Sequence, residues 1–179
     1  MTILIDTSSL LSLVRYYLPF DRDGILFDFF QNKIEEKEII VIDKVIEECK
    51  YTAKGIVLEQ LGYLKLKKNH KKTDLILPTK KFFNQLENNF INGSAKNKLT
   101  SVQFENRKND FLESADAKLI LCSLAKIREN LVIVSEESES TNDNKAFKKL
   151  PTICKFLDLE IMTLPELIDK YEGIDLTFG

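Results

Sequence analysis

The sequence contains one histidine, His70, and three cysteines, Cys49, Cys122 and Cys154, among its 179 residues. A single histidine argues against a histidine acid–base pair and against a histidine-bound zinc site, and we expect His70 to be an exposed side chain. The cysteines are odd in number, scattered and embedded in apolar segments. We therefore expect buried reduced thiols rather than a disulfide framework or a zinc site.

The sequence also lacks membrane and export signals. No apolar run approaches the roughly 18 residues that span a bilayer, and the N-terminus has no basic region followed by an apolar stretch and a cleavage site. The formal net charge is only −2, so bulk electrostatics does not indicate a nucleic-acid partner. We see no internal repeat and no low-complexity segment. These absences predict a cytoplasmic protein with no membrane partner.

The composition is that of a soluble globular protein, with 44% hydrophobic and 30% charged residues. A domain usually takes roughly 100–200 residues, so we expect residues 1–179 to form a single domain. The apolar run TILI at 2–5 predicts a buried strand, and the hydroxyls of Thr7, Ser8 and Ser9 can cap the helix that follows and that Pro19 closes. Further strands are expected at 39–42, 131–134 and 159–162, and further helices at 25–36, 43–54, 56–69, 79–91, 114–128, 151–157 and 165–171. This alternation predicts a three-layer α/β sandwich around a central, mostly parallel sheet of four to five strands.

A lysine-rich section interrupts this pattern at about 62–110, where we expect a helical insertion. Within it, residues 65–81 carry many lysines and one acid, Asp74. Such a run beside an acidic site can hold a phosphate backbone, and the alternatives are a solvated helix face or a surface for a protein partner. The proposed RNA-binding side chains are Lys65, Lys67, Lys68, Lys71 and Lys72.

Four acidic positions are the most informative feature of the chain. Asp6 follows TILI, Glu48 lies in VIEEC, Asp116 in ADAKLILCSLA, and Glu137 follows LVIVSE. A buried strand that ends in an acid brings charge to the carboxyl edge of a parallel sheet, where open α/β folds bind their ligands. Carboxylates in this number suit a hard cation such as Mg²⁺ or Mn²⁺. The sequence therefore predicts a divalent metal site.

Each of these acids also has a purely structural interpretation. Asp6 can cap the first helix, and Asp116 can be a favourable anion in the first turn of its own helix. Glu48 can lie on a solvated helix face, and Glu137 can be part of a polar loop. The register stays open at two positions, where the facing acid is either Glu47 or Glu48, and one of Glu136, Glu137, Glu139 or Asp143.

The order and context of the acids resemble a known family. ILIDTSSLLSL, VIEEC, SADAKLILCSLAK and LVIVSEE, in this order along nearly the whole chain, are similar to motifs of the PIN-domain superfamily of metal-dependent ribonucleases. The late segment KKLPTICKFLDLEIMTLPELI looks like the C-terminal part of an uncharacterised bacterial branch of PIN-like proteins.

This resemblance implies that Asp6, Glu48, Asp116 and Glu137 bind Mg²⁺ or Mn²⁺ and catalyse hydrolysis of RNA phosphodiester bonds, with Ser8 and Ser135 as polar neighbours. It implies RNA as a partner. Some PIN proteins are toxins paired with an antitoxin, so an antitoxin protein is a candidate partner, as is a second copy of the chain. The alternative is a catalytically inactive PIN-like module that binds RNA or protein. A receiver-like phosphate-handling domain is disfavoured, because no acidic pair follows the first strand.

Overall fold

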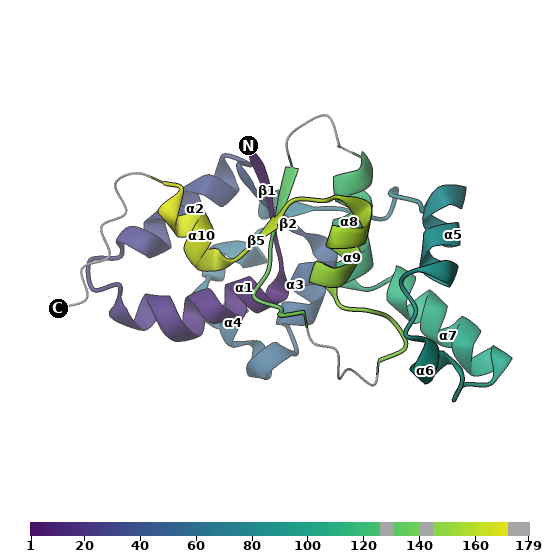
Figure 1. Cartoon of the computed structure of the whole chain (residues 1–179). Helices are drawn as coiled ribbons and strands as arrows, with labels where there is room; N and C mark the ends of the chain where they lie inside the picture. The colour runs from purple at the N-terminus through teal and green to yellow at the C-terminus, as the bar shows by residue number, and fades with distance from the viewer. Residues whose placement is uncertain (126–130, 140–144, 172–179) are drawn as a thin grey trace.

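The computed structural model describes residues 1–125, 131–139 and 145–171. Its centre is a five-stranded sheet in the order β3-β2-β1-β4-β5, in which every neighbouring pair is parallel. Helices cover both faces of the sheet: α2 and α10 lie on one side, and α8 and α9 on the other (Figure 1). The predicted three-layer α/β sandwich with a mostly parallel central sheet is therefore confirmed.

The elements have the following bounds. The strands are β1 (Thr2–Ile5), β2 (Ile39–Ile42), β3 (His70–Lys71), β4 (Leu131–Val134) and β5 (Ile161–Met162). The α-helices are α1 (Thr7–Ser12), α2 (Ile25–Glu35), α3 (Asp43–Cys49), α4 (Ile56–Gln60), α5 (Lys80–Asn88), α6 (Gly93–Lys96), α7 (Ser101–Leu112), α8 (Ala115–Ala125), α9 (Leu150–Leu157) and α10 (Leu164–Asp169). A π-helical turn, η1 (Leu13–Tyr17), continues α1, and shorter 3₁₀ turns are η2 (Leu18–Phe20), η3 (Thr52–Gly55), η4 (Gly62–Lys65) and η5 (Lys67–Asn69).

The central strand β1 marks the point where the strand order reverses. The chain passes from β1 to β2 on one side, and β4 pairs with the other side of β1, with Ile5 in register with Val134. In open α/β sheets, ligands bind beyond the carboxyl ends of the strands at such a switch point. The residues that follow the two strands are Asp6 and Ser135. Both therefore lie at the place where this fold favours a functional site.

The core that holds this edge in place is built from the apolar runs seen in the sequence. Ile3, Leu4 and Ile5 are fully buried, and every residue of β4 is buried. Burial of one such aliphatic side chain contributes about 1.5–3 kcal/mol, so the three consecutive residues of β1 anchor the strand firmly. The three cysteines are buried and free, as expected. Within the described ranges, the structure has no helix of the length and apolar character needed to cross a bilayer.

The section at 62–110 is more varied than the expected helical insertion. It begins with the turns η4 and η5, contributes the edge strand β3, and continues into α5, α6 and α7, which lie beyond α8 on the side away from the sheet (Figure 1). The expectation that His70 is exposed is wrong. The side chain is half-buried, and its Nε2 atom contacts the carbonyl oxygen of Leu64.

Candidate functional site

Asp6 lies at the carboxyl end of β1 and is almost fully buried, with 4% of its surface exposed. Its Oδ1 atom accepts a hydrogen bond from the backbone N–H of Thr7 at 2.6 Å, and Oδ2 accepts one from the N–H of Ser8 at 3.4 Å. Asp6 is thus the N-cap of α1. The structural interpretation of this residue is correct, and its position at the switch point leaves the functional interpretation open as well.

Two serine hydroxyls, one from α1 and one from the residue after β4, hold the carboxylate of Asp6. Ser8 Oγ donates to Asp6 Oδ2 at 2.7 Å and Ser135 Oγ donates to the same atom at 3.0 Å. The backbone N–H of Glu136 donates to Ser8 Oγ at 2.9 Å, and that of Glu137 donates to Ser135 Oγ at 3.2 Å. The structure therefore places both serines beside Asp6, and their hydrogen bonds join the ends of β1 and β4.

Glu48 faces the site and Glu47 does not. The hydroxyl of Thr7 donates to Glu48 Oε2 at 2.8 Å, and the N–H of Ala115 donates to Glu48 Oε1 at 3.4 Å. Glu47 instead pairs with Lys44 at 3.4 Å. The pKa of Glu48 is raised, first by burial of the carboxyl group and then by the negative charges of Asp6 and Glu137. Sequence reasoning missed the role of Thr7 in orienting this glutamate, because the two residues lie far apart along the chain.

Asp116 lies in the first turn of α8, which begins immediately after Ser114. Its pKa is raised well above the ordinary value of 3.8, chiefly by burial and next by the charges of Asp6, Glu137 and Glu48, while Lys145 acts in the opposite direction. The charges of three acids from other segments thus act on Asp116. The structure brings together all four acids that the sequence singled out.

The glutamates after β4 have different surroundings. Glu136 Oε1 accepts a hydrogen bond from the N–H of Leu164 at 2.6 Å and so gives one of the first backbone N–H groups of α10 an acceptor. Glu139 pairs with Lys155 at 3.7 Å. Glu137 is half-buried, and its Oε2 atom is buried without a hydrogen-bond partner among the described residues. Glu137 is therefore the glutamate that faces the site, while the alternative Asp143 lies outside the described residues.

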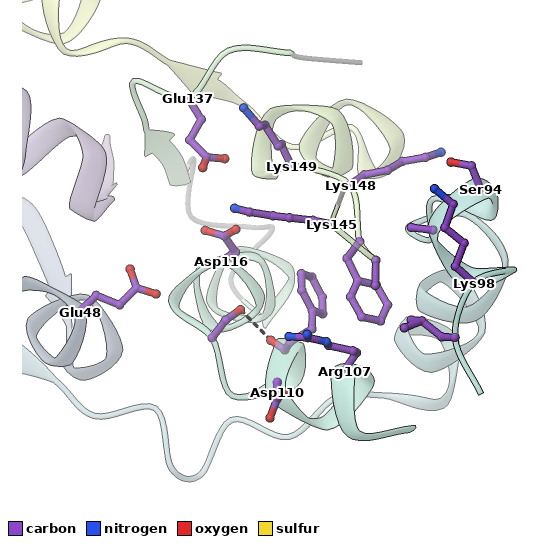
Figure 2. A pocket seen from close by; sticks show the side chains of 16 residues that line it. Glu48, Ser94, Lys98, Arg107, Asp110, Asp116, Glu137, Lys145, Lys148 and Lys149 are labelled. Atoms are coloured by element: carbon purple, nitrogen blue, oxygen red, sulfur yellow. Dashed lines mark hydrogen bonds between the residues drawn. The ribbon is translucent and has the colours of Figure 1, made fainter. Parts of the chain in front are cut away.

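A cavity of about 850 Å³ opens beside this cluster, and Glu48, Asp116 and Glu137 line one end of it. Figure 2 shows their carboxylates directed toward a shared space. The rest of the lining is rich in cations that the sequence reasoning missed, because they are scattered over several segments: Lys98, Arg107, Lys145, Lys148 and Lys149. The predicted RNA-binding lysines, Lys65, Lys67, Lys68, Lys71 and Lys72, do not line this cavity.

The donor set fits a hard divalent cation. The four carboxylates offer only oxygen atoms, as Mg²⁺ and Mn²⁺ prefer. Burial and then repulsion raise the pKa of Asp116; a cation would offset the repulsion and would give the buried Oε2 atom of Glu137 a partner. With the side chains as they stand, the described residues include no group of three or more potential ligands close enough to hold a metal ion. Binding would therefore require the carboxylates to move closer together.

Comparisons with known proteins give a family and no activity. Residues 3–173 match the model of a family described as "Domain of unknown function (DUF4411)", and the chain belongs to that family. No curated protein and no solved structure matches the chain.

Proposed function

We propose that this member of the DUF4411 family is a Mg²⁺- or Mn²⁺-dependent endoribonuclease of the PIN-like type. One observation supports this proposal most. Asp6, Glu48 and Glu137 come from three separate segments near Asp116 at the switch point of a parallel sheet, and their charges, after burial, raise the pKa of Asp116 well above its ordinary value. Repelling carboxylates destabilise a fold that binds no cation, so a site that serves a metal ion explains why they are placed together.

In this proposal Glu48, Asp116 and Glu137, which line the cavity, would hold the metal ion together with Asp6. When bound, the ion supplies Lewis acidity toward a phosphoryl oxygen and a lowered pKa for the attacking water. Ser8 and Ser135 fix the orientation of the Asp6 carboxylate. Thr7 fixes that of Glu48. In the net reaction water forms a new bond to phosphorus, and one phosphodiester P–O bond breaks.

The motif order in the sequence supports the same proposal, since it resembles the PIN-domain superfamily from the Asp-Thr-Ser turn to the LVIVSEE strand. On this interpretation RNA is the substrate, and a toxin role would add an antitoxin protein as partner. A small reading frame next to the gene would favour the toxin role.

The decisive experiment is a cleavage assay on end-labelled single-stranded and hairpin RNA with Mg²⁺, Mn²⁺ or a chelator. We expect cleavage with either metal and none with the chelator or with Asp6→Asn. Asparagine is also a good helix N-cap, so this variant keeps the cap of α1 while it removes the charge. Binding of RNA without any cleavage, by wild type and variant alike, would favour the inactive binding module.

A further inference from the structure

The cavity beside the acidic cluster has a wall of opposite charge. Lys98 lies between α6 and α7, Arg107 on α7, and Lys149 at the start of α9. Figure 2 shows Lys98 and Arg107 on the side of the cavity away from Glu48, and Lys149 nearer to Glu137. Asp110 is the one acid of the lining on the α7 side among the described residues. One cavity thus offers carboxylates for cations and an excess of positive charge for an anion.

Within the part of the chain that the structure describes, no ion pair neutralises the charge of this wall. Lys98, Arg107 and Lys149 form no ion pair with any described carboxylate, although the adjacent Lys108 pairs with Glu87 at 3.1 Å and with Glu105 at 2.8 Å. Unpaired cations that line one cavity raise its positive potential and attract a polyanion. An extended ligand with several negative charges suits the wall better than a single small anion does.

An aromatic pair lines the cavity together with the cations. The rings of Phe111 and Phe147 stack with centroids 4.7 Å apart and an interplanar angle of 25°. Phe147 is almost fully buried, whereas Phe111 is only half-buried. Exposed aromatic surface beside cations is typical of single-strand binding sites, because unpaired bases can stack on it. The bases of a duplex are already stacked on one another and cannot use it in this way.

We propose that the wall formed by Lys98, Arg107 and Lys149 is the binding site for the phosphate backbone of single-stranded RNA, with Phe111 contacting its bases. This inference rests on the proposed function and specifies where its substrate lies. The lysine run suggested by the sequence is less suitable. Lys65, Lys67 and Lys68 precede β3, near the N-terminal end of β2, where Lys68 pairs with Glu35 at 3.4 Å. The carboxylates lie at the opposite end of the sheet, beyond the carboxyl ends of the strands.

Two triple variants with the same loss of charge test the location. The wall variant carries Lys98→Gln, Arg107→Gln and Lys149→Gln, and the matched control carries Lys65→Gln, Lys67→Gln and Lys68→Gln. Affinity for a short unstructured fluorescent RNA is measured across a salt series in EDTA, so that no cleavage interferes. Removing one cation that binds a phosphate of a single strand lowers the slope of log affinity against log salt by about 0.7. We expect a reduction of about 2 for the wall variant and an unchanged slope for the control.

Other outcomes would overturn the inference. Equal reductions in both variants would mean that binding follows net charge, and an unchanged slope in the wall variant would exclude this wall. Unlabelled duplex RNA that competes as well as single-stranded RNA would exclude the single-strand preference. Melting curves of both variants establish that they fold. Binding in EDTA is measured separately from catalysis. If wild type cleaves RNA but the wall variant keeps the wild-type salt slope, only the proposed binding wall is refuted. If the slopes change as expected but wild type does not cleave RNA, only the proposed nuclease activity is refuted.

Discussion

At the scale of single residues, Asp116 is the most direct test of the site. We predict that Asp116→Asn abolishes cleavage but leaves the free energy of unfolding in EDTA unchanged or higher. The charge of Asp116 is disfavoured by burial and then by repulsion from Asp6, Glu137 and Glu48, so its removal relieves strain in the protein without metal. Cleavage assays and urea melts measure the two effects.

The matched control is Asp110→Asn, which removes the same charge from the lining of the same cavity. We expect it to retain cleavage. A large drop in melting temperature for Asp116→Asn, with no metal present, would mean that the carboxylate serves mainly as a first-turn anion of α8.

Glu47 and Glu48 provide a second comparison between adjacent residues. We predict that Glu48→Gln reduces cleavage at least tenfold, because Glu48 accepts from Thr7 and Ala115 and faces the acidic cluster. Glu47→Gln should stay within twofold of wild type, since it removes only an exposed pair with Lys44, of a kind that contributes about 0–1 kcal/mol. Steady-state rates at equal metal concentration measure both. The reverse order of activities would place the wrong glutamate in the site.

The sequence identified Asp6 and Asp116 because each has a local signal, a strand end before a Thr-Ser turn and an Ala-Asp pair before an apolar helix. It could not choose between Glu136 and Glu137. The choice depends on Leu164, which lies 28 residues further along the chain. Its backbone N–H donates a hydrogen bond to the carboxylate of Glu136. Spacing within LVIVSEE contains no information about that contact.

At the scale of elements, the hydrogen bonds between the ends of β1 and β4 determine how rigid the site is. We predict that Ser135→Ala weakens metal binding about tenfold and lowers the free energy of unfolding by about 1–2 kcal/mol. The variant leaves Asp6 Oδ2 with one side-chain donor fewer and the N–H of Glu137 without its acceptor. Mn²⁺ titration and urea melts measure the two quantities.

Ser123→Ala is the control for this prediction. Ser123 is also buried, and its hydroxyl donates to the carbonyl oxygen of Leu119 at 3.0 Å within α8. Removal of this hydroxyl should affect stability but not Mn²⁺ affinity. If both variants bind Mn²⁺ as wild type does, the serine bridge has only a structural role.

The elements themselves were largely predictable, since the buried strands β1, β2 and β4 are continuous apolar runs. The edge strand β3 was not. It has only two residues, His70 and Lys71, and takes its conformation from pairing with β2 rather than from its own pattern. The cationic wall was equally hidden, because Lys98, Arg107 and Lys149 come from separate segments that only the folded chain brings to one cavity.

At the scale of the whole molecule, the acidic cluster couples folding, pH and metal binding. Asp116 and Glu48 have pKa values raised above their ordinary 3.8 and 4.5. As pH rises through the ordinary pKa values, these two carboxyl groups lose their protons in the unfolded chain before they lose them in the folded chain. The free energy of unfolding therefore falls, until pH passes the raised pKa values of the folded state. Glu113 and Glu166 have lowered pKa values and act in the opposite direction.

A comparison of wild type with Asp116→Asn separates the contribution of Asp116 from those of the other titrating groups. Asp116→Asn shares every other titrating group with wild type, so wild type in EDTA should lose stability relative to the variant as pH rises above about 4. Mn²⁺ binds only deprotonated ligands, so the stabilisation of wild type by Mn²⁺ should grow with pH over the same range. It should reach about 2.7 kcal/mol where free Mn²⁺ is a hundredfold above its dissociation constant. The variant should lose most of this effect. Urea melts across pH, with and without Mn²⁺, measure both trends, and parallel curves for the two proteins would show that Asp116 takes no part in a metal site.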